Sequence, residues 1–235
     1  MSDRHRGEID DDVAAGLATA ALSLARGLAA GGTLWCWAPG SSHHAQHVAV
    51  EFVHPVVVGS RAVPAVAIPA VGADDAVDAL RPLARGGDTL LVVGGDDECV
   101  GPVLQRALAW GVRALWMGCG PRPVAGRADH LLWVSDDASA AHDGRLTLGY
   151  HLLWELTQVC FEHPGLLDAP DQGTATCVTC ADEGRLAEVV SSAGSDAVVR
   201  TAAGTETVST RLVGPIGAGD LVLVHAGTAI TVVPA

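Results

Sequence analysis

Through the first two thirds of the chain, short apolar runs alternate with amphipathic segments. The apolar runs predict strands at 33–40, 62–68, 88–95, 112–118 and 129–135. The segments around them predict helices at 9–30, 41–54, 74–84, 98–110 and 145–163. This alternation is typical of an α/β fold, with a parallel sheet covered by helices on both faces. Ligands of such sheets bind where strands end, so the loops at 38–44 and 94–98 are the first places to look for a site.

The pattern changes after the last predicted helix. Five short runs with partial alternation follow, separated by Gly, Ser or Asp, at 184–190, 197–200, 205–213, 220–227 and 229–233. Such runs predict a small all-β barrel or sandwich. We therefore expect an α/β domain over 1–165, a Pro- and Gly-containing linker over 166–176, and a β-barrel over 177–235. So short a barrel buries little core and is expected to need its neighbour or a partner.

Composition narrows the classes of partner. The chain has 235 residues and a formal net charge of −13. No basic run interrupts this acidity, so nucleic acid and anionic lipid are disfavoured, and proteins or small molecules are the expected partners. The polar, acidic segment 1–13 is unlike a signal peptide, and no uninterrupted apolar stretch is long enough to cross a membrane. We expect a soluble, cytoplasmic protein.

Six cysteines are present, and a reducing compartment predicts thiols rather than disulfides. Four lie in or beside apolar segments and are expected in the core: Cys36, Cys99, Cys119 and Cys160. Cys177 and Cys180 instead form a C-x-x-C pair in a polar stretch, which alone indicates a zinc half-site, a redox pair or nothing. The only His of the barrel is His225, so a closed zinc site is disfavoured, and the βαβ context of a redox pair is missing. One or two thiolates and one imidazole suit iron, zinc or copper, and an incomplete ligand set fits a carrier that releases its metal.

Two segments of this module carry a family resemblance. GRLAEV begins at Gly184, and GDLVLVHAGTAI covers 219–230. Together with the preceding Cys, they resemble the hydrogenase maturation chaperones of the HypC/HupF family. The resemblance implies an OB-like barrel that carries an iron–cyanide–carbonyl group to the precursor of the nickel–iron hydrogenase large subunit, together with an iron–sulfur maturation chaperone. It implies metal contacts from Cys177 or Cys180 and from His225.

This sequence departs from the family in placing its cysteines inside the chain rather than next to the initiator Met. Cys-Val-Thr-Cys-Ala-Asp replaces the usual Cys-x-x-x-Pro, so the spacing does not decide between the two thiols; Cys177 is slightly favoured because it leads the motif. The alternative interpretation is that both cysteines are incidental and that His225 is an ordinary strand residue.

The α/β part resembles the sugar isomerase (SIS) domain family, and within it the phosphoheptose isomerases. The resemblance rests on the loop and helix APGSSHHAQHVAVEF at 38–52 and on the helix at 145–163. His47 and Glu51 are four residues apart and share a helical face, a spacing that suits a shared metal or a base with its orienting partner. The resemblance implies that Glu51 and His151 act in proton transfer if isomerase activity is retained.

The same resemblance implies zinc or another divalent metal held by His47, Glu51 and His151. Where the family has a Gln, this chain has Asp143, with His142 adjacent; Asp143 is therefore a fourth candidate ligand, and His142 is the alternative at this position. For each of these residues alone, an ordinary solvated helix position is the simpler interpretation. The resemblance also implies a homo-oligomer formed through the SIS-like domain.

The phosphate site of the family is altered. Gly40, Ser41 and Ser42 remain as candidate ligand-binding residues in the first loop, but Pro39 removes one N–H donor. The second loop, GGDDEC at 94–99, is acidic and would repel a phosphate dianion.

Two main functions remain. We expect a nickel–iron hydrogenase maturation factor whose SIS-like domain binds a ligand or docks a partner; the alternative is a phosphosugar isomerase with an accessory barrel. A plain metal-binding scaffold is a third, less favoured, interpretation.

Overall fold

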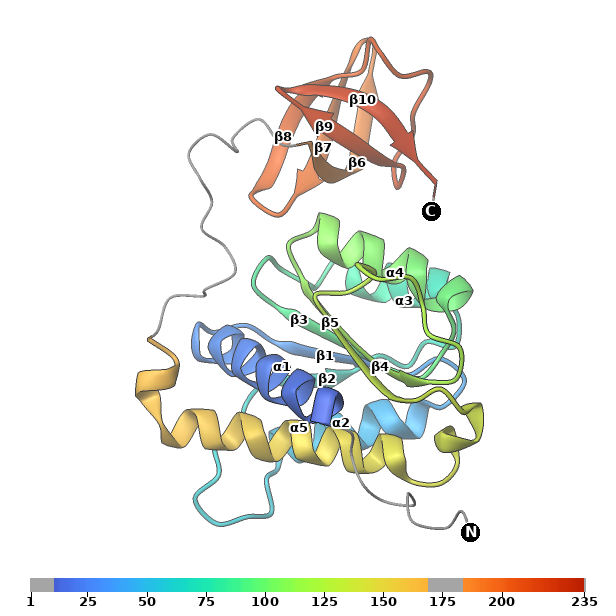
Figure 1. Cartoon of the computed structure of the whole chain (residues 1–235). Coiled ribbons are helices and arrows are strands. Elements are labelled where there is room, and N and C mark those ends of the chain that lie inside the picture. The colour runs from blue at the N-terminus through green and yellow to red at the C-terminus, as the bar shows by residue number, and fades with distance from the viewer. Residues whose placement is uncertain (1–10, 169–183, 235) are drawn as a thin grey trace.

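The computed structural model describes residues 11–168 and 184–234, which form two units (Figure 1). The N-terminal unit has five α-helices: α1 (Asp11–Ala29), α2 (Ser42–Val53), α3 (Ala73–Leu80), α4 (Asp97–Ala109) and α5 (Arg145–Glu162). Its strands are β1 (Leu34–Trp37), β2 (Ala65–Ala67), β3 (Thr89–Val93), β4 (Arg113–Cys119) and β5 (His130–Ser135), and two short 3₁₀ turns are η1 (Ala138–Ala141) and η2 (Pro164–Leu166). The C-terminal unit has β6 (Arg185–Ala193), β7 (Asp196–Thr201), β8 (Gly204–Ser209), β9 (Leu221–His225) and β10 (Thr228–Val233).

The N-terminal sheet is parallel, with strand order β2-β1-β3-β4-β5. Every residue of β1 and β3 is buried. Successive side chains of β1 point to opposite faces, so Leu34 and Cys36 enter one core while Trp35 and Trp37 enter the other. Continuous apolar strands of this kind need helices on both faces, as the sequence pattern predicted.

Helices α1, α2 and α5 cover one face of the sheet (Figure 1). Helix α1 is long and apolar enough to cross a membrane by length and composition alone, over Asp12–Ala29. In the structure it packs against α5 and β5, and Leu17, Leu24 and Leu28 are buried in the core beneath it. Its apolar face is therefore accounted for by packing within this unit.

Helices α3 and α4 cover the opposite face, and the C-terminal unit lies on their outer side (Figure 1). This unit is a closed barrel with strand order β10-β8-β7-β6-β9. Its interior is filled by small and β-branched side chains, among them Val189, Val199, Val222 and Val224. Leu221, on the outer face of β9, is buried in the core formed with α3 and α4, and Leu186 and Val233 pack against the same core. The barrel thus gains apolar burial from its neighbour, as expected for so small a core.

A buried carboxylate joins the two units. The side chain of Glu188 in β6 is only 3% exposed. Trp110 donates its indole N–H to Oε2 of Glu188 at 2.7 Å, and Arg81 donates two bonds to Oε1 at 3.1 and 3.0 Å. Arg106 forms a further ion pair at 3.8 Å. A buried charge is stable only when it is paired and hydrogen-bonded, and here all of its partners come from the other unit.

An arginine of the barrel makes the reverse connection. Arg200 in β7 donates to the carbonyl oxygens of Arg81 and Ala84, just beyond the end of α3, at 2.8 and 2.7 Å. Its guanidinium also lies 4.6 Å from the centroid of the Trp110 ring. A cation at the carbonyl end of a helix is favoured by the helix dipole, and the indole face adds a cation–π interaction.

Beside this contact, the turn between β7 and β8 packs closely against the backbone of the N-terminal unit at Gly111. A Cβ on Gly111 would lie 2.8 Å from the Cα of Ala202, and Gly111 has a φ of +72°. Glycine is therefore required here both by its backbone conformation and by the approach of the turn.

The predicted fold class is confirmed: a parallel sheet between helices, followed by a small closed barrel. The domain boundaries stay a prediction, because most of the expected linker and the start of the barrel module lie outside the described residues. Two of the four cysteines expected in the core are buried, Cys36 and Cys160. The prediction was wrong for Cys99 and Cys119, which are partly exposed because each lies at an element end, one in the first turn of α4 and the other at the last residue of β4.

Candidate functional site

Helix α2 follows the carboxyl end of β1 and carries two of the candidate ligands. Ala45, Val48, Ala49 and Phe52 form its buried face. His47 and Glu51 lie one turn apart on the other side, which leaves their side chains 45% and 27% exposed. The helix therefore anchors itself in the core through one face and presents an imidazole and a carboxylate on the other.

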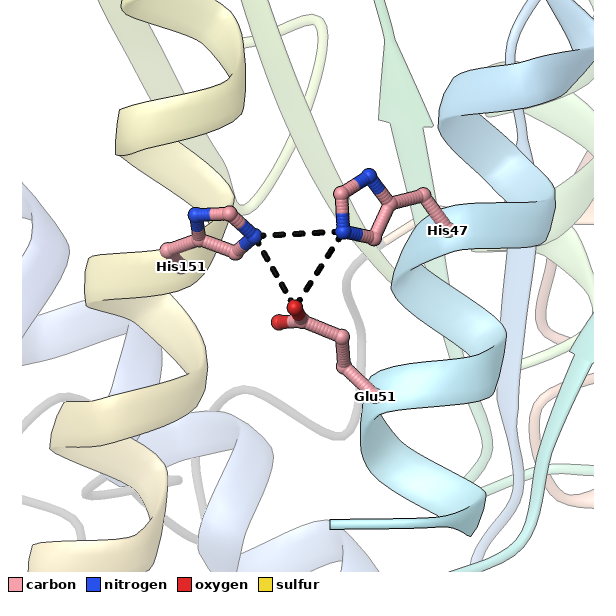
Figure 2. A group of neighbouring side chains, drawn as sticks. All are labelled: His47, Glu51 and His151. Atoms are coloured by element: carbon pink, nitrogen blue, oxygen red, sulfur yellow. Dashed lines mark hydrogen bonds and ion pairs between the residues drawn. The ribbon is translucent and has the colours of Figure 1, made fainter. Parts of the chain in front are cut away.

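Helix α5 brings the third ligand to the same point, as Figure 2 shows. The Nε2 atom of His151 lies 2.9 Å from Oε1 of Glu51 and 3.3 Å from Nε2 of His47. The Nε2 atom of His47 lies 3.2 Å from the same carboxylate oxygen. Three ligand atoms thus converge from two helices that are about a hundred residues apart in sequence.

The geometry of this group fits a transition-metal ion. Ligands bound at about 2.0–2.1 Å in tetrahedral or octahedral arrangement are separated by about 2.9–3.4 Å. All three edges of the His47–Glu51–His151 triangle fall in that range. Two imidazoles and one carboxylate form the ligand set of catalytic zinc and of non-heme iron sites, in which further positions stay open. The three residues could therefore hold a divalent ion.

A buried tyrosine supports the group from behind. The hydroxyl oxygen of Tyr150 lies 3.1 Å from Nδ1 of His47 and donates to Oγ1 of Thr147 at 3.2 Å. A hydroxyl that donates to Thr147 accepts from the Nδ1–H of His47, and this tautomer leaves Nε2 free to bind a metal. The sequence interpretation missed Tyr150, although it directly precedes His151.

A second histidine, His44, also lies near this hydroxyl. Nδ1 of His44 lies 3.4 Å from the Tyr150 oxygen, and its ring contacts that of His43. Burial, together with the nearby His43 and His47, lowers the pKa of His44. Burial raises the pKa of Tyr150. Both shifts favour the neutral forms of the groups that support His47.

Asp143, the fourth candidate ligand, is not brought to the triangle. Its carboxylate is held by Arg145, with Nε and Nη2 at 2.8 and 2.7 Å, and these bonds lower the pKa of Asp143. Asp143, His142 and Arg145 instead line a separate cavity of about 660 Å³ at the start of α5. The sequence interpretation did not weigh this pairing, although Arg145 lies only two residues from Asp143.

The first loop approaches the site through the start of α2. Gly40 has a φ of +70°, which glycine adopts readily. Ser41 occupies the N-cap position, but its hydroxyl makes no capping bond to the helix. Ser41 and Ser42 stay candidate ligand-binding residues.

The acidic loop is more constrained than its sequence suggests. Asp96 caps α4 by accepting from the backbone N–H of Cys99 at 2.9 Å. Asp97 pairs with Arg127 at 3.0 Å. A carboxylate already occupies the end of α4 where an anion would bind, so this loop is poorly suited to phosphate.

The candidate ligand of the barrel, His225, ends strand β9. Val222 and Val224 point into the barrel interior, so alternation places His225 on the outer face with Leu221 and Leu223. Leu221 lies at the contact with α4, and His225 is four residues further along, about 13 Å away. His225 is partly exposed at the barrel end remote from that contact. Cys177 and Cys180 lie outside the described residues, so their distance from His225 stays untested.

Comparison with known proteins divides the chain at the same place. Residues 185–235 match the HupF/HypC family. No curated protein matches the chain. Among solved structures, a phosphoheptose isomerase from Francisella tularensis aligns with a TM-score of 0.55 and 19% identity, over 63% of this chain and 90% of that one. The phosphoheptose isomerase GmhA from Neisseria gonorrhoeae aligns with a TM-score of 0.50 and 18% identity, over 62% and 86%.

At these identities the structural likeness shows the fold alone. The C-terminal barrel of this chain thus matches the HupF/HypC family over residues 185–235, and the unit that precedes it has the fold of the phosphoheptose isomerases.

Proposed function

We propose that this chain is a nickel–iron hydrogenase maturation factor whose barrel carries an iron–cyanide–carbonyl group. The observation that carries this proposal is the HupF/HypC match over 185–235, which contains the strand ending in His225. Within that strand the imidazole lies on the outer face of the barrel, where a metal group and a partner protein have access to it. A histidine sealed in the interior would not serve this purpose.

Cys177 or Cys180 is the proposed sulfur ligand of the carried iron. A thiolate is a soft donor and an imidazole a borderline one, and together they suit iron. Two protein ligands leave most of the coordination sphere to the cargo's own cyanide and carbonyl groups, which favours release. The proposed partners are an iron–sulfur maturation chaperone, as donor, and the precursor of the hydrogenase large subunit, as acceptor.

Hydrogenase maturation in cells tests this proposal. Replacing both Cys177 and Cys180 with Ala, or His225 with Ala, should abolish iron loading of the large subunit. The control is His163→Ala, at the far end of α5 in the other unit. Normal maturation in the double cysteine variant would contradict the proposal, and loss in the control would show a fold defect instead.

The N-terminal unit is proposed to act as a ligand-binding or docking module with a divalent-metal site at His47, Glu51 and His151. A bound metal would supply Lewis acidity there, and Glu51 or His151 would hold or move a proton of the ligand. The convergence of these three residues favours a retained site and keeps phosphosugar isomerisation as the second candidate function. The carboxylate of Asp96 at the N-terminus of α4 disfavours a phosphate-bearing substrate in the 94–99 loop.

Two measurements separate the candidates. Zinc or cobalt binding by calorimetry, lost in His47→Ala, tests the metal site. Turnover of sedoheptulose 7-phosphate that is lost in Glu51→Gln would favour the isomerase function over the maturation function. We further propose a cytoplasmic location and self-association through the N-terminal unit, which size-exclusion chromatography with light scattering tests.

A further inference from the structure

Positive charge gathers where the barrel meets the N-terminal unit. All 14 basic residues of this acidic chain are arginines. Four of them meet at this junction: Arg81, Arg85, Arg106 and Arg200. Three carboxylates lie beside them. Glu188 and the exposed Asp78 are already paired with Arg81, and the buried Asp88 accepts from the backbone N–H of Arg85 rather than from its guanidinium.

Arg85 and Arg200 have no carboxylate partner among the ion pairs of the described residues. Arg85 donates from Nη1 to the carbonyl oxygens of Pro82, Leu83 and Ala84. Arg200 donates to two carbonyl oxygens of the same segment. Neutral carbonyl groups satisfy donors but do not cancel the charges, so two guanidinium groups remain unneutralised. Burial lowers the pKa of Arg200, and the nearby Arg85 and Arg81 lower it further, against the opposing effect of Glu188.

These two arginines line a cleft between the units. It has a volume of about 530 Å³ and is bounded by Arg85, Gly86 and Trp110 of the N-terminal unit on one side and, on the other, by residues 200–205 of the barrel, where β7 turns into β8. That volume falls in the range of small-molecule sites. None of the residues that line it carries a carboxylate, while Thr201 and Thr205 contribute hydroxyl groups. The cleft therefore offers charge, hydrogen-bond donors and space together.

We propose that this interdomain cleft binds the phosphate group of a small metabolite. Two guanidinium groups match the charge of a phosphate dianion, and their planar N–H groups suit its oxygens. Arg85 comes from the N-terminal unit and Thr205 from the barrel, so a bound phosphate contacts both units and stabilises their docking. The volume beyond the two arginines accommodates the organic part of the ligand. This site lies on the α3–α4 side of the sheet, away from the His47–Glu51–His151 triangle.

Binding to the full chain tests the proposal. Inorganic phosphate and glucose 6-phosphate should each bind in calorimetry and raise the melting temperature, whereas chloride at equal ionic strength and glucose should not. Arg85→Gln removes one charge and should weaken phosphate binding at least about tenfold. The matched control is Arg122→Gln, which removes an exposed arginine paired with Asp136 outside the cleft and should leave the affinity unchanged.

A second variant distinguishes a loss of phosphate binding from a folding defect in Arg85→Gln. Thr205→Glu places a carboxylate at an exposed position of β8, opposite Arg200, and should abolish the phosphate response while the melting temperature without phosphate changes little. The proposal is overturned if phosphate has no effect on the unmodified chain, if both cleft variants keep the full response, or if glucose 6-phosphate fails to bind. Neither result bears on iron loading by the barrel, so the two proposals fail independently.

Discussion

The hydroxyl of Tyr150 links the candidate metal ligands to the protein interior. It is the hydrogen-bond partner that orients His47, and partners of metal-bound histidines commonly change metal affinity by one to two orders of magnitude. Tyr150→Phe keeps the buried ring and removes only this bond. We expect it to weaken zinc or cobalt binding about tenfold, as measured by competition with a chromophoric chelator.

The matched control for this variant lies on the same helix. Thr157→Val removes a buried hydroxyl that donates to the carbonyl oxygen of Leu153 at 2.6 Å, about two turns of α5 beyond Tyr150. It should lower stability without changing metal affinity. Equal affinities for Tyr150→Phe and the unmodified chain would show that Tyr150 only packs.

Sequence could predict part of this site. Spacing alone placed His47 and Glu51 on one helical face, and the resemblance supplied His151. Neither pointed to Tyr150, because the contact of Tyr150 with His47 depends on how α2 and α5 pack rather than on either helix. Asp143 was expected at the metal and is instead held by Arg145, a local pairing that a motif comparison does not weigh.

Strand β6 carries the strongest polar link between the two units. Glu188→Gln keeps the shape of the side chain but replaces a charge that Arg81 and Arg106 compensate. We expect the free energy of unfolding in urea to fall by about 2 kcal/mol, since bonds to a buried charge are worth more than neutral ones. Glu206→Gln, in the exposed pair with Arg185, should change it by less than about 1 kcal/mol. Similar values for both would contradict a special role of Glu188.

The β7–β8 turn gives a second test of docking. Gly111→Ala should destabilise the chain by about 1–3 kcal/mol more than Gly126→Ala. Both glycines have positive φ and share the backbone strain, but a Cβ on Gly126 meets nothing within 4 Å whereas one on Gly111 meets Ala202. Thermal unfolding of the two variants measures the difference. Equal losses would mean that the turn does not press on Gly111.

At the scale of elements, the sequence predicted the helices and strands but not how the two units contact each other. Each predicted helix and strand overlaps an observed one, because buried strands and amphipathic helices leave a local pattern. The contact of Glu188 with Trp110 leaves none, since it joins positions 78 residues apart in sequence. A glutamate in an alternating strand indicates a solvated side chain by default.

Across the whole molecule, the sheet separates the candidate metal site from the barrel. The triangle lies on the α2–α5 side and the barrel on the α3–α4 side (Figure 1). We therefore expect Glu51→Gln to lose metal binding without altering the barrel. Amide hydrogen exchange in β6 and β9 should be the same in the variant and in the unmodified chain, and the same with and without zinc. Slower exchange in those strands on addition of zinc would instead show coupling through the sheet.

The opposite signs of Glu188 and Arg200 have a geometric consequence. A barrel turned by half a revolution on the same surface would bring its cation to Arg81 and Arg106 and its anion to the carbonyl groups after α3, and both encounters would be repulsive. Only one orientation of the barrel on this surface is therefore favourable, and it fixes the direction that His225 faces relative to the sheet. A protein that binds this face of the barrel would meet the N-terminal unit at a constant angle. Under the proposed function, the N-terminal unit would therefore restrict sterically which acceptors reach His225.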